Sequence, residues 1–143
     1  MALTLFGSSD TNALIDALHR SQAIIEFDLS GNILHANDLF LTAMGYSLKE
    51  VRGRHHSIFV SPEYRDSAEY KAFWESLRSG EFQSAEFKRF AKDGRVVWIQ
   101  ASYNPIFGRN GNPYKVVKFA TDITAPKIRN MDYRGQIEAI GKS

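Results

Sequence analysis

The stretch "FKRFAKDGRVVWIQASYNPI" at residues 87–106 decides the fold of this chain. Apolar and polar residues alternate on both sides of the pair Asp93 and Gly94, and this alternation is typical of β-strands. An Asp-Gly pair between two such runs is a strong signal for a β-hairpin. We therefore predict an antiparallel hairpin with strands over 82–91 and 95–106.

The neighbouring segments extend this hairpin into a sheet. A third strand, over 114–123, follows the loop "GRNGNP", which is rich in turn residues. Earlier in the chain, "SQAIIEFDL" and "ILHA" flank the turn "SGN" and predict strands over 22–29 and 32–36. An isolated hairpin is only marginally stable in water, so this pair joins the other three strands in one sheet. The fold class is therefore α+β, with a five-stranded antiparallel sheet.

The clearest helical signal spans residues 62–79. Ser61 is its expected cap, Pro62 occupies the tolerated first position, and Gly80 ends it. The aromatic and aliphatic residues of this segment recur at helical spacing and predict one buried face. They are Tyr70, Phe73, Trp74 and Leu77.

Shorter helices precede this one, and two helices flank the whole unit. Asn37 predicts the cap of one short helix, and Ser47 with Glu50 forms the capping box of another. The short helices and the longer one are expected to cover one face of the sheet. The chain then divides into an N-terminal flanking helix, a central domain and a C-terminal linking helix, at residues 1–20, 21–125 and 126–143.

Composition excludes several classes of protein. Apolar residues make up 43% of the 143, so the chain can form a globular core. The net charge is only +2 and no basic run occurs, which argues against nucleic-acid binding. The absence of cysteine excludes disulfides and thiolate chemistry. No apolar stretch is long enough for a membrane span, so we expect a cytoplasmic segment with no membrane insertion.

Several motifs stand in an order that resembles a PAS domain over residues 21–125. They are "DLSGNILHAND", "LFLTAMGYSLKEVRG", "FWESLRSGEF", "FKRFAKDGRVVWIQASYNPI" and "VVKFATDIT". More narrowly, the set is similar to the PAS domains of methyl-accepting chemotaxis and aerotaxis transducers. This resemblance implies a sensory module of a bacterial chemotaxis or energy-taxis transducer. Such a module would sense a ligand or redox state in an internal cavity and relay it through its flanking helices. The alternative is a cofactor-free PAS module for dimerisation or interaction.

The resemblance also implies a cavity between the sheet and the short helices. The residues that we expect at a cofactor there are Asn37, His55, His56, Trp74, Phe87, Tyr103 and Phe119. FAD is the first candidate, because flavin-binding relatives resemble this chain at the amide of Asn37 and the aromatic wall of Trp74. The chain departs from them at Val60 and Ser61, where those relatives carry an Arg-His pair that contacts the FAD phosphates.

Heme b is the second candidate, and a domain without cofactor also remains open. Heme-binding PAS domains usually take the axial histidine from the longer helix, but residues 62–79 contain none. His55 or His56 would then be the iron ligand, and the sequence predicts no other metal site. A flavin–thiol adduct is excluded, because that chemistry needs a cysteine.

The alternation within residues 96–107 does not decide which face of the strand is buried. One face carries Val97, Ile99, Ala101 and Tyr103, and the other carries Trp98, Gln100, Ser102 and Asn104. Trp98 is therefore a further candidate for the wall of the cavity. No set of nucleophile, base and orienting group is visible, so we do not expect an enzyme.

Signal relay is expected at "TDIT", residues 121–124, where the last strand meets the exit helix. Asp122 and Thr124 can bond each other's backbone or cap that helix. Beyond it, "RGQIEAIGKS" at 134–143 resembles "NALIDALHRS" at 12–21. Unless the likeness arose by chance, an adjacent PAS unit follows. The apolar stripes of both flanking helices further predict a homodimer, formed through the N-terminal one.

Overall fold

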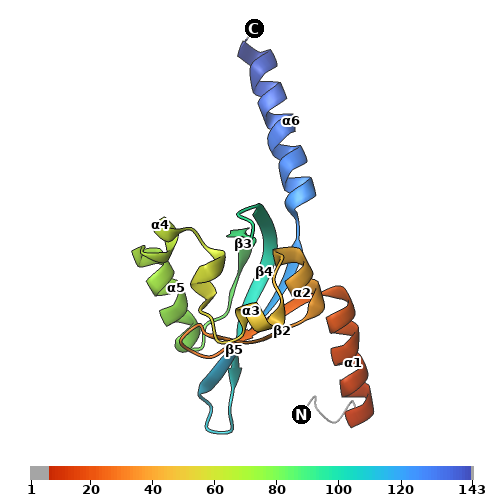
Figure 1. The fold of residues 1–143 in the computed structure, drawn as a ribbon, viewed down its shortest axis with the longest axis vertical. Coiled ribbons are helices and arrows are strands. Elements are labelled where there is room, and N and C mark those ends of the chain that lie inside the picture. The colour runs from red at the N-terminus through yellow and green to blue at the C-terminus, as the bar shows by residue number, and fades with distance from the viewer. Residues whose placement is uncertain (1–6, 143) are drawn as a thin grey trace.

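Five strands form one antiparallel sheet in the order β2-β1-β5-β4-β3 (Figure 1). The computed structural model describes the backbone of residues 7–142 and the side chains of residues 7–135. The strands are β1 (Ala23–Phe27), β2 (Ile33–Ala36), β3 (Gln83–Phe90), β4 (Val96–Phe107) and β5 (Pro113–Asp122). Each lies within two residues of its predicted bounds, so the five-stranded antiparallel sheet is confirmed.

The pairing of β1 with β5 joins the first hairpin to the last three strands. Ile24 lies opposite Phe119, and β5 therefore runs through the centre of the sheet. On its other side β5 pairs with β4, where Tyr103 lies opposite Lys118. Residues that are far apart in sequence thus become direct neighbours at the middle of the sheet.

Short helices cover one face of the sheet, as the sequence predicts (Figure 1). They are α2 (Asp38–Met44), α3 (Leu48–Val51), the 3-10 helix η2 (His56–Phe59), α4 (Pro62–Arg65) and α5 (Ala68–Arg78). Asn37 caps α2, and Ser47 forms the predicted capping box with Glu50 at α3. These caps hold the short helices at fixed positions above the sheet.

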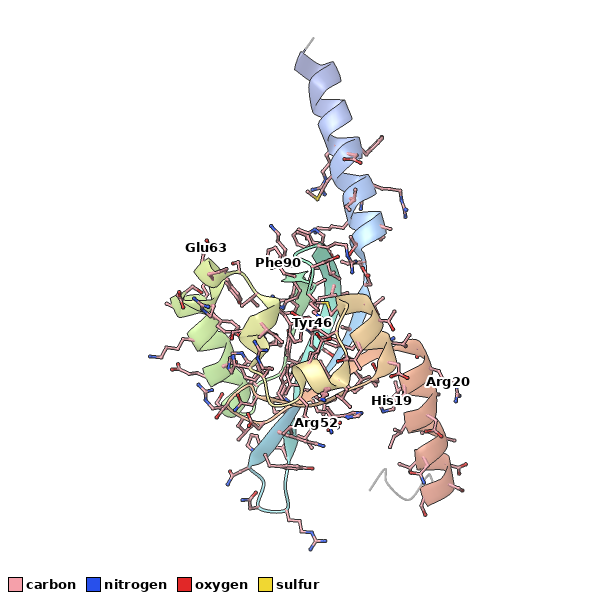
Figure 2. All side chains as sticks on the ribbon, viewed as in Figure 1. His19, Arg20, Tyr46, Arg52, Glu63 and Phe90 are labelled. Carbon is pink, nitrogen blue, oxygen red and sulfur yellow. The ribbon has the colours of Figure 1, made fainter. Side chains whose placement is uncertain are left out.

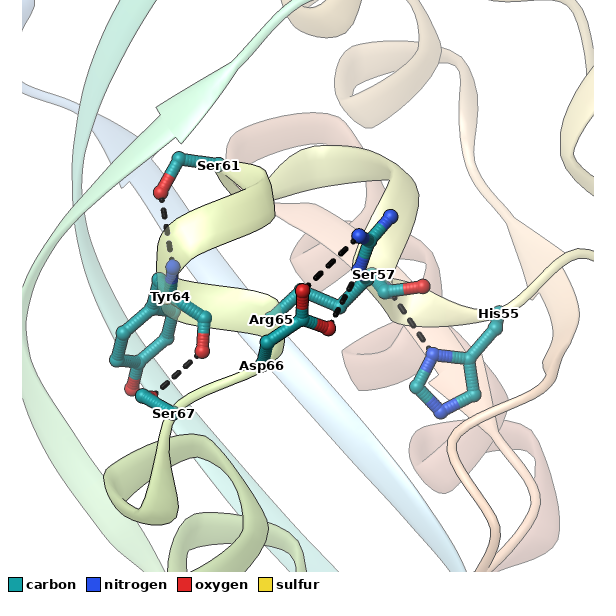
Figure 3. A network of polar contacts seen from close by, with 7 residues as sticks. All are labelled: His55, Ser57, Ser61, Tyr64, Arg65, Asp66 and Ser67. Atoms are coloured by element: carbon teal, nitrogen blue, oxygen red, sulfur yellow. Dashed lines mark hydrogen bonds and ion pairs between the residues drawn. The ribbon is translucent and has the colours of Figure 1, made fainter.

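The prediction of one continuous helix over 62–79 is wrong, because the segment breaks at Asp66 and Ser67 into α4 and α5. Ser67 Oγ accepts a hydrogen bond from Tyr70 N at 3.1 Å. It also donates one to Tyr64 O at 2.6 Å, which Figure 3 shows. Arg65 forms an ion pair with Asp66 beside this break. Ser67 therefore acts as the cap of a new helix, which competes with continuation of the first.

The inner face of β4 is the one that carries Tyr103. Val97, Ile99, Ala101 and Tyr103 are buried beneath the short helices, whereas Trp98 is half-buried on the opposite face. Trp74 of α5 is 4% exposed, so its predicted burial is confirmed. The alternation seen in the sequence thus separates a core face from an outer face of the sheet.

Two helices flank the domain. Helix α1 (Ser8–Ser21) precedes β1, and α6 (Thr124–Lys142) leaves the end of β5 and projects away from the sheet (Figure 1). Ile137 and Ile140, which belong to the predicted stripe of the exit helix, lie outside the described side chains. Across the described residues, no helix is long and apolar enough to cross a membrane.

Candidate functional site

Five polar side chains from five different elements meet beneath the short helices. They form the buried cluster His56, Tyr70, Arg89, Tyr103 and Lys118, contributed by η2, α5, β3, β4 and β5. Arg89 is 3% exposed, Lys118 is 1% exposed, and His56 and Tyr103 are fully buried. Charged side chains are rarely buried so completely in a protein core unless they are paired.

Hydrogen bonds link four members of the buried cluster in a chain. Arg89 Nη2 donates to Tyr103 Oη at 3.1 Å, and Tyr103 Oη lies 2.9 Å from His56 Nε2. His56 Nδ1 lies 2.7 Å from Tyr70 Oη. Because Arg89 can only donate, the Tyr103 hydroxyl is free to donate to Nε2 of a neutral His56. We assign the His56 proton to Nδ1 from this network, and it then donates to Tyr70.

Burial strongly affects the titration of this cluster. It lowers the pKa of His56 well below its usual value, and the positive charges of Arg89 and Lys118 lower it further. The pKa of Lys118 is also well below its usual value, first because of burial and then because of Arg89. Burial raises the pKa of Tyr103. The neutral forms of His56, Lys118 and Tyr103 are therefore all favoured.

Among the residues that the structure describes, no carboxylate pairs with either basic side chain of the cluster. Within the described part of the chain, the ion pairs involve other residues, and neither Arg89 nor Lys118 takes part in one. Arg89 Nε and Trp74 Nε1 are buried without a hydrogen-bond acceptor. Aromatic rings supply part of the stabilisation: the Arg89 guanidinium lies 4.7 Å from the Phe87 ring centroid, and Lys118 Nζ lies 4.8 Å from that of Tyr103.

A hollow of about 580 Å³ opens from the surface toward Arg89. It lies between η2 and α4 on one side and β3 on the other, and Figure 2 labels Glu63 and Phe90 on its two sides. The residues that line it are Val60, Ser61, Glu63, Tyr64, Glu86, Phe87, Lys88, Arg89 and Phe90. Arg89 is the one member of the buried cluster in this lining.

Trp74 and Phe87 lie beside the buried cluster. The Trp74 ring centroid is 5.4 Å from that of His56, and the Phe87 ring centroid is 5.4 Å from that of Tyr103. The structure thus brings together four of the predicted cofactor residues, Trp74, Phe87, His56 and Tyr103. No cofactor contact follows from this grouping alone.

His55 is not part of the buried cluster and instead binds the turn between β1 and β2. Its Nδ1 accepts a hydrogen bond from Ser57 N at 3.0 Å (Figure 3), so Nε2 carries the proton that is donated to Ser30 O at 2.9 Å. Gly31 in that turn has a positive φ of 90°, and a Cβ there would lie 2.7 Å from His55 Nε2. His55 therefore fixes the first hairpin against η2.

Asn37 lies away from the buried cluster and ties α1, β1 and α2 together. Its Oδ1 accepts hydrogen bonds from Ile24 N and Phe40 N, each at 3.0 Å. Its Nδ2 donates to Gln22 O at 2.8 Å and lies 3.2 Å from His19 Nδ1. All four hydrogen-bonding positions of the amide are occupied, so a cofactor could bind it only by displacing one of these partners.

Phe119 and Trp98 lie on the outer face of the sheet, so the expectation that they line an internal cavity is wrong. Phe119 pairs with Ser102 across β4 and lines an outer hollow together with Ile15 and Leu18 of α1. The alternation of β5 explains this result, because Lys118 and Ala120 on either side of Phe119 point into the core.

Asp122 and Thr124 clamp the start of α6 to β4. Asp122 Oδ1 accepts a hydrogen bond from Thr124 N at 2.9 Å, and Thr124 Oγ1 accepts one from Trp98 N at 2.9 Å. Lys127, one turn further along α6, lies 4.9 Å from the centroid of a Trp98 ring and bonds Glu86 at 2.7 Å. Glu86 also lines the hollow that leads to Arg89.

The arrangement of these side chains does not fit flavin or heme. Trp74 is 4% exposed and packs against Phe27, His56 and Phe73, with ring centroids 5.4 to 5.9 Å apart, so a flavin ring could reach it only by displacing core side chains. His56 and His55 each have both ring nitrogens in hydrogen bonds, so either would have to break one to bind iron.

Sequence reasoning missed the two buried cations. Lys118 stands between Val116 and Ala120 in a strand that alternates, so the spacing places these three on one face without saying which face is buried. Arg89 similarly follows Phe87 by two residues in β3. In both cases a basic residue shares a strand face with apolar residues. Basic residues are usually exposed, so this pattern was not interpreted as a buried site.

Comparison with known families and proteins gives one consistent result. The family model described as "PAS fold" matches residues 33–120. The biofilm dispersion protein BdlA of Pseudomonas aeruginosa is 48% identical over 110 residues, which cover 77% of this chain and 26% of that protein. The aerotaxis receptor of Escherichia coli is 34% identical over 79 residues, which cover 55% of this chain and 15% of that receptor. The chain thus spans only about a quarter of the length of BdlA and a smaller share of the aerotaxis receptor.

Solved structures give the same fold at lower identity. The PAS domain of a Colwellia psychrerythraea protein superimposes with a TM-score of 0.70 and 23% identity, over 80% of this chain and 98% of that one. A light-oxygen-voltage domain studied with a flavin analogue gives 0.68 and 23%, over 92% of this chain and 99% of that one. These similarities support the architecture of the domain.

Proposed function

Because the chain belongs to the PAS family, we propose that it is a sensory module of a chemotaxis or energy-taxis type signal transducer. A small ligand at the buried cluster is its input, and the start of α6 is its output. The likeness to an aerotaxis receptor supports this assignment. We propose a ligand in preference to a flavin or heme, because Asn37 and His56, which would hold those groups, already use their polar atoms in hydrogen bonds within the protein.

One observation carries the proposal: the two central strands bear both the buried cluster and the clamp on α6. β4 contributes Tyr103 to the cluster and Trp98 to the clamp, and β5 contributes Lys118 and Asp122. A shift of either strand would therefore move both the buried cluster and the clamp at the start of α6. The module is not catalytic in this proposal, and its place in the cytoplasm stays a prediction.

Replacing Tyr103 by Phe is expected to change hydrogen exchange at the start of α6. The substitution removes the hydroxyl that joins Arg89 to His56 but keeps the ring. Amide exchange of Trp98 and Ile123 should then change by about fivefold, the equivalent of one ordinary hydrogen bond. Exchange in β1 serves as the reference for global unfolding.

Two further variants make this test specific. In chains that carry Thr124→Val, adding Tyr103→Phe should no longer change the amide exchange of Trp98 and Ile123. The reason is that Thr124 Oγ1 is the acceptor of Trp98 N. Tyr114→Phe is the matched control, since this tyrosine is exposed near the far end of β5. If Tyr103→Phe leaves exchange at Trp98 and Ile123 unchanged relative to β1, the proposed relay is refuted.

The outer surface supports a second role, dimerisation through α1. Leu14, Ile15 and Leu18 of α1 form an apolar stripe and are each 42% to 50% exposed. Ile15 and Leu18 also line the hollow of about 370 Å³ on the outer face of the sheet. We propose that the stripe packs against the same stripe of a second copy. An isolated helix of this length is marginal in water, which favours such a contact.

Replacing Ile15 by Glu is expected to shift the chain from dimer to monomer, because a charge in an apolar interface is costly. The mass in solution, measured by light scattering at several concentrations, is the readout. Asp16→Asn, at the next position of the same exposed helix, is the control. A monomeric wild-type chain, or an Ile15→Glu chain that dimerises as strongly as wild type, contradicts this role.

We also propose that an adjacent PAS unit follows α6.

A further inference from the structure

Arg89 is a buried cation with an incomplete set of partners. Its Nη1 donates to Lys88 O and its Nη2 to Tyr103 Oη, both at 3.1 Å, and both acceptors are neutral. Its Nε has no acceptor among the residues that the structure describes. Burying a charge without a counter-charge is costly, and a missing anion at Nε would account for the arrangement.

The hollow beside η2 and α4 leads to this side chain. Arg89 belongs to its lining, and the remaining wall combines apolar groups with a balanced set of charges. Val60, Phe87 and Phe90 supply the apolar part. The lining also includes Glu63, Glu86, Lys88 and Arg89, whose formal charges cancel, and Glu86 is already paired with Lys127 of α6.

These two features restrict the class of anion. A carboxylate fits the Nε–H and the remaining Nη protons of a guanidinium, whose planar donors match its geometry. A dianionic phosphate would place a second negative charge in a wall that also contains Glu63. The apolar wall, in turn, suits an organic body of a few carbons.

We propose that this hollow binds a small organic monocarboxylate, with Arg89 as the residue that holds its carboxylate. The inference rests on the proposed sensory function and gives the chemical class of its ligand. The wall residue Glu86 bonds Lys127 of α6, so an occupant of the hollow lies one residue from the exit helix.

Calorimetric titration of the purified chain tests the inference. The probes are hexanoate and benzoate, their neutral amides hexanamide and benzamide, and inorganic phosphate. An absorbance spectrum is recorded first, because co-purified flavin or heme in the domain would overturn this ligand class. The carboxylates should bind and raise the midpoint of thermal unfolding, and the amides should bind about 10- to 100-fold more weakly, the value of a charge-assisted hydrogen bond.

Variants identify the residue that holds the carboxylate. Arg89→Gln should weaken hexanoate binding by about 10- to 100-fold, whereas Arg54→Gln, on an exposed arginine outside the hollow, should leave it unchanged. Lys88→Glu changes an exposed residue of the lining, so it tests the site even if Arg89→Gln fails to fold. It should weaken binding, and Glu63→Gln should strengthen it.

Several results would overturn the inference. They are no binding of either carboxylate, equal binding of the amides, phosphate binding as tight as hexanoate, or unchanged affinity in a folded Arg89→Gln or Lys88→Glu chain. The relay is measured separately by exchange at Trp98 and Ile123. Loss of carboxylate binding with an intact relay therefore removes only the ligand class, whereas loss of the relay removes the sensory function.

Discussion

Replacing Trp74 by Ala is expected to lower the free energy of unfolding by about 3–5 kcal/mol, the usual cost of removing a buried large aromatic side chain. Trp74 is 4% exposed and packs against Phe27, His56 and Phe73. The cavity left behind would lie at the centre of the domain, where the surrounding rings can collapse only partly. Chemical denaturation followed by circular dichroism measures the change.

The two tryptophans make the test a matched comparison. Trp98→Ala removes the same side chain from the outer face, where it is half-buried beside Lys127, and should cost clearly less. Trp74→Phe keeps a ring in the core and should lower the free energy of unfolding by less than Trp74→Ala does. It therefore tests the packing role of Trp74 even if the alanine variant fails to fold. Equal midpoints for Trp74→Ala and the wild-type chain would refute the packing role.

Replacing Lys118 by Met is expected to make the domain more stable, by about 1–4 kcal/mol, the range found when buried ion pairs are replaced by well-packed apolar groups. The physical reason is that burial favours neutral Lys118, so folding near neutral pH costs the release of a proton that methionine never carries. Lys118 is 1% exposed, and no carboxylate pairs with it in the described structure. Met has a similar length and needs no solvation. The midpoint of thermal unfolding should therefore rise.

Lys115→Met is the control on the same strand. Lys115 forms a partly exposed ion pair with Glu26 at 2.6 Å, and losing such a pair should cost about 0–1 kcal/mol. The two lysines of β5 should thus respond with opposite signs. A Lys118→Met chain that is less stable than wild type would mean that Lys118 is compensated in the folded state.

The stability difference between the Lys118→Met and wild-type chains should also depend on pH. The pKa of Lys118 is lowered in the folded state, whereas an unfolded lysine titrates near 10.5. Below that pH the unfolded chain binds a proton that the folded chain binds poorly, so wild-type stability falls as pH falls. The gain from Met should therefore be large near neutral pH and shrink as the pH rises toward 10.5. A gain that is independent of pH would contradict the lowered pKa.

We expect Lys118 and Arg89 to reduce stability, because both are buried without a carboxylate partner in the described structure, and such a cost favours a functional role. A sequence optimised only for folding would carry apolar residues at two inward positions of β3 and β5. We expect such conflicts between local rules and burial mainly at functional sites.

The sequence by itself determined the strands, the turns and the caps. Alternation around Asp93 and Gly94 located β3 and β4, and Ser47 with Glu50 located α3, because these signals depend on neighbours a few residues apart. It also predicted the bonded pair Asp122 and Thr124 at the start of α6. The one local error was the helix break at Ser67, a cap that the longer periodic pattern concealed.

Only the tertiary structure decided which face of the sheet is buried and which side chains meet there. Tyr103 and Lys118 become neighbours through the pairing of β4 with β5. Because Lys118 then faces the core, the next residue, Phe119, lies on the outer face. His56 meets Tyr103 across 47 positions of sequence. Such contacts depend on register and on burial, which are properties of the assembled sheet and helices. No local sequence pattern specifies them, because the free energy that selects them comes from packing the whole core.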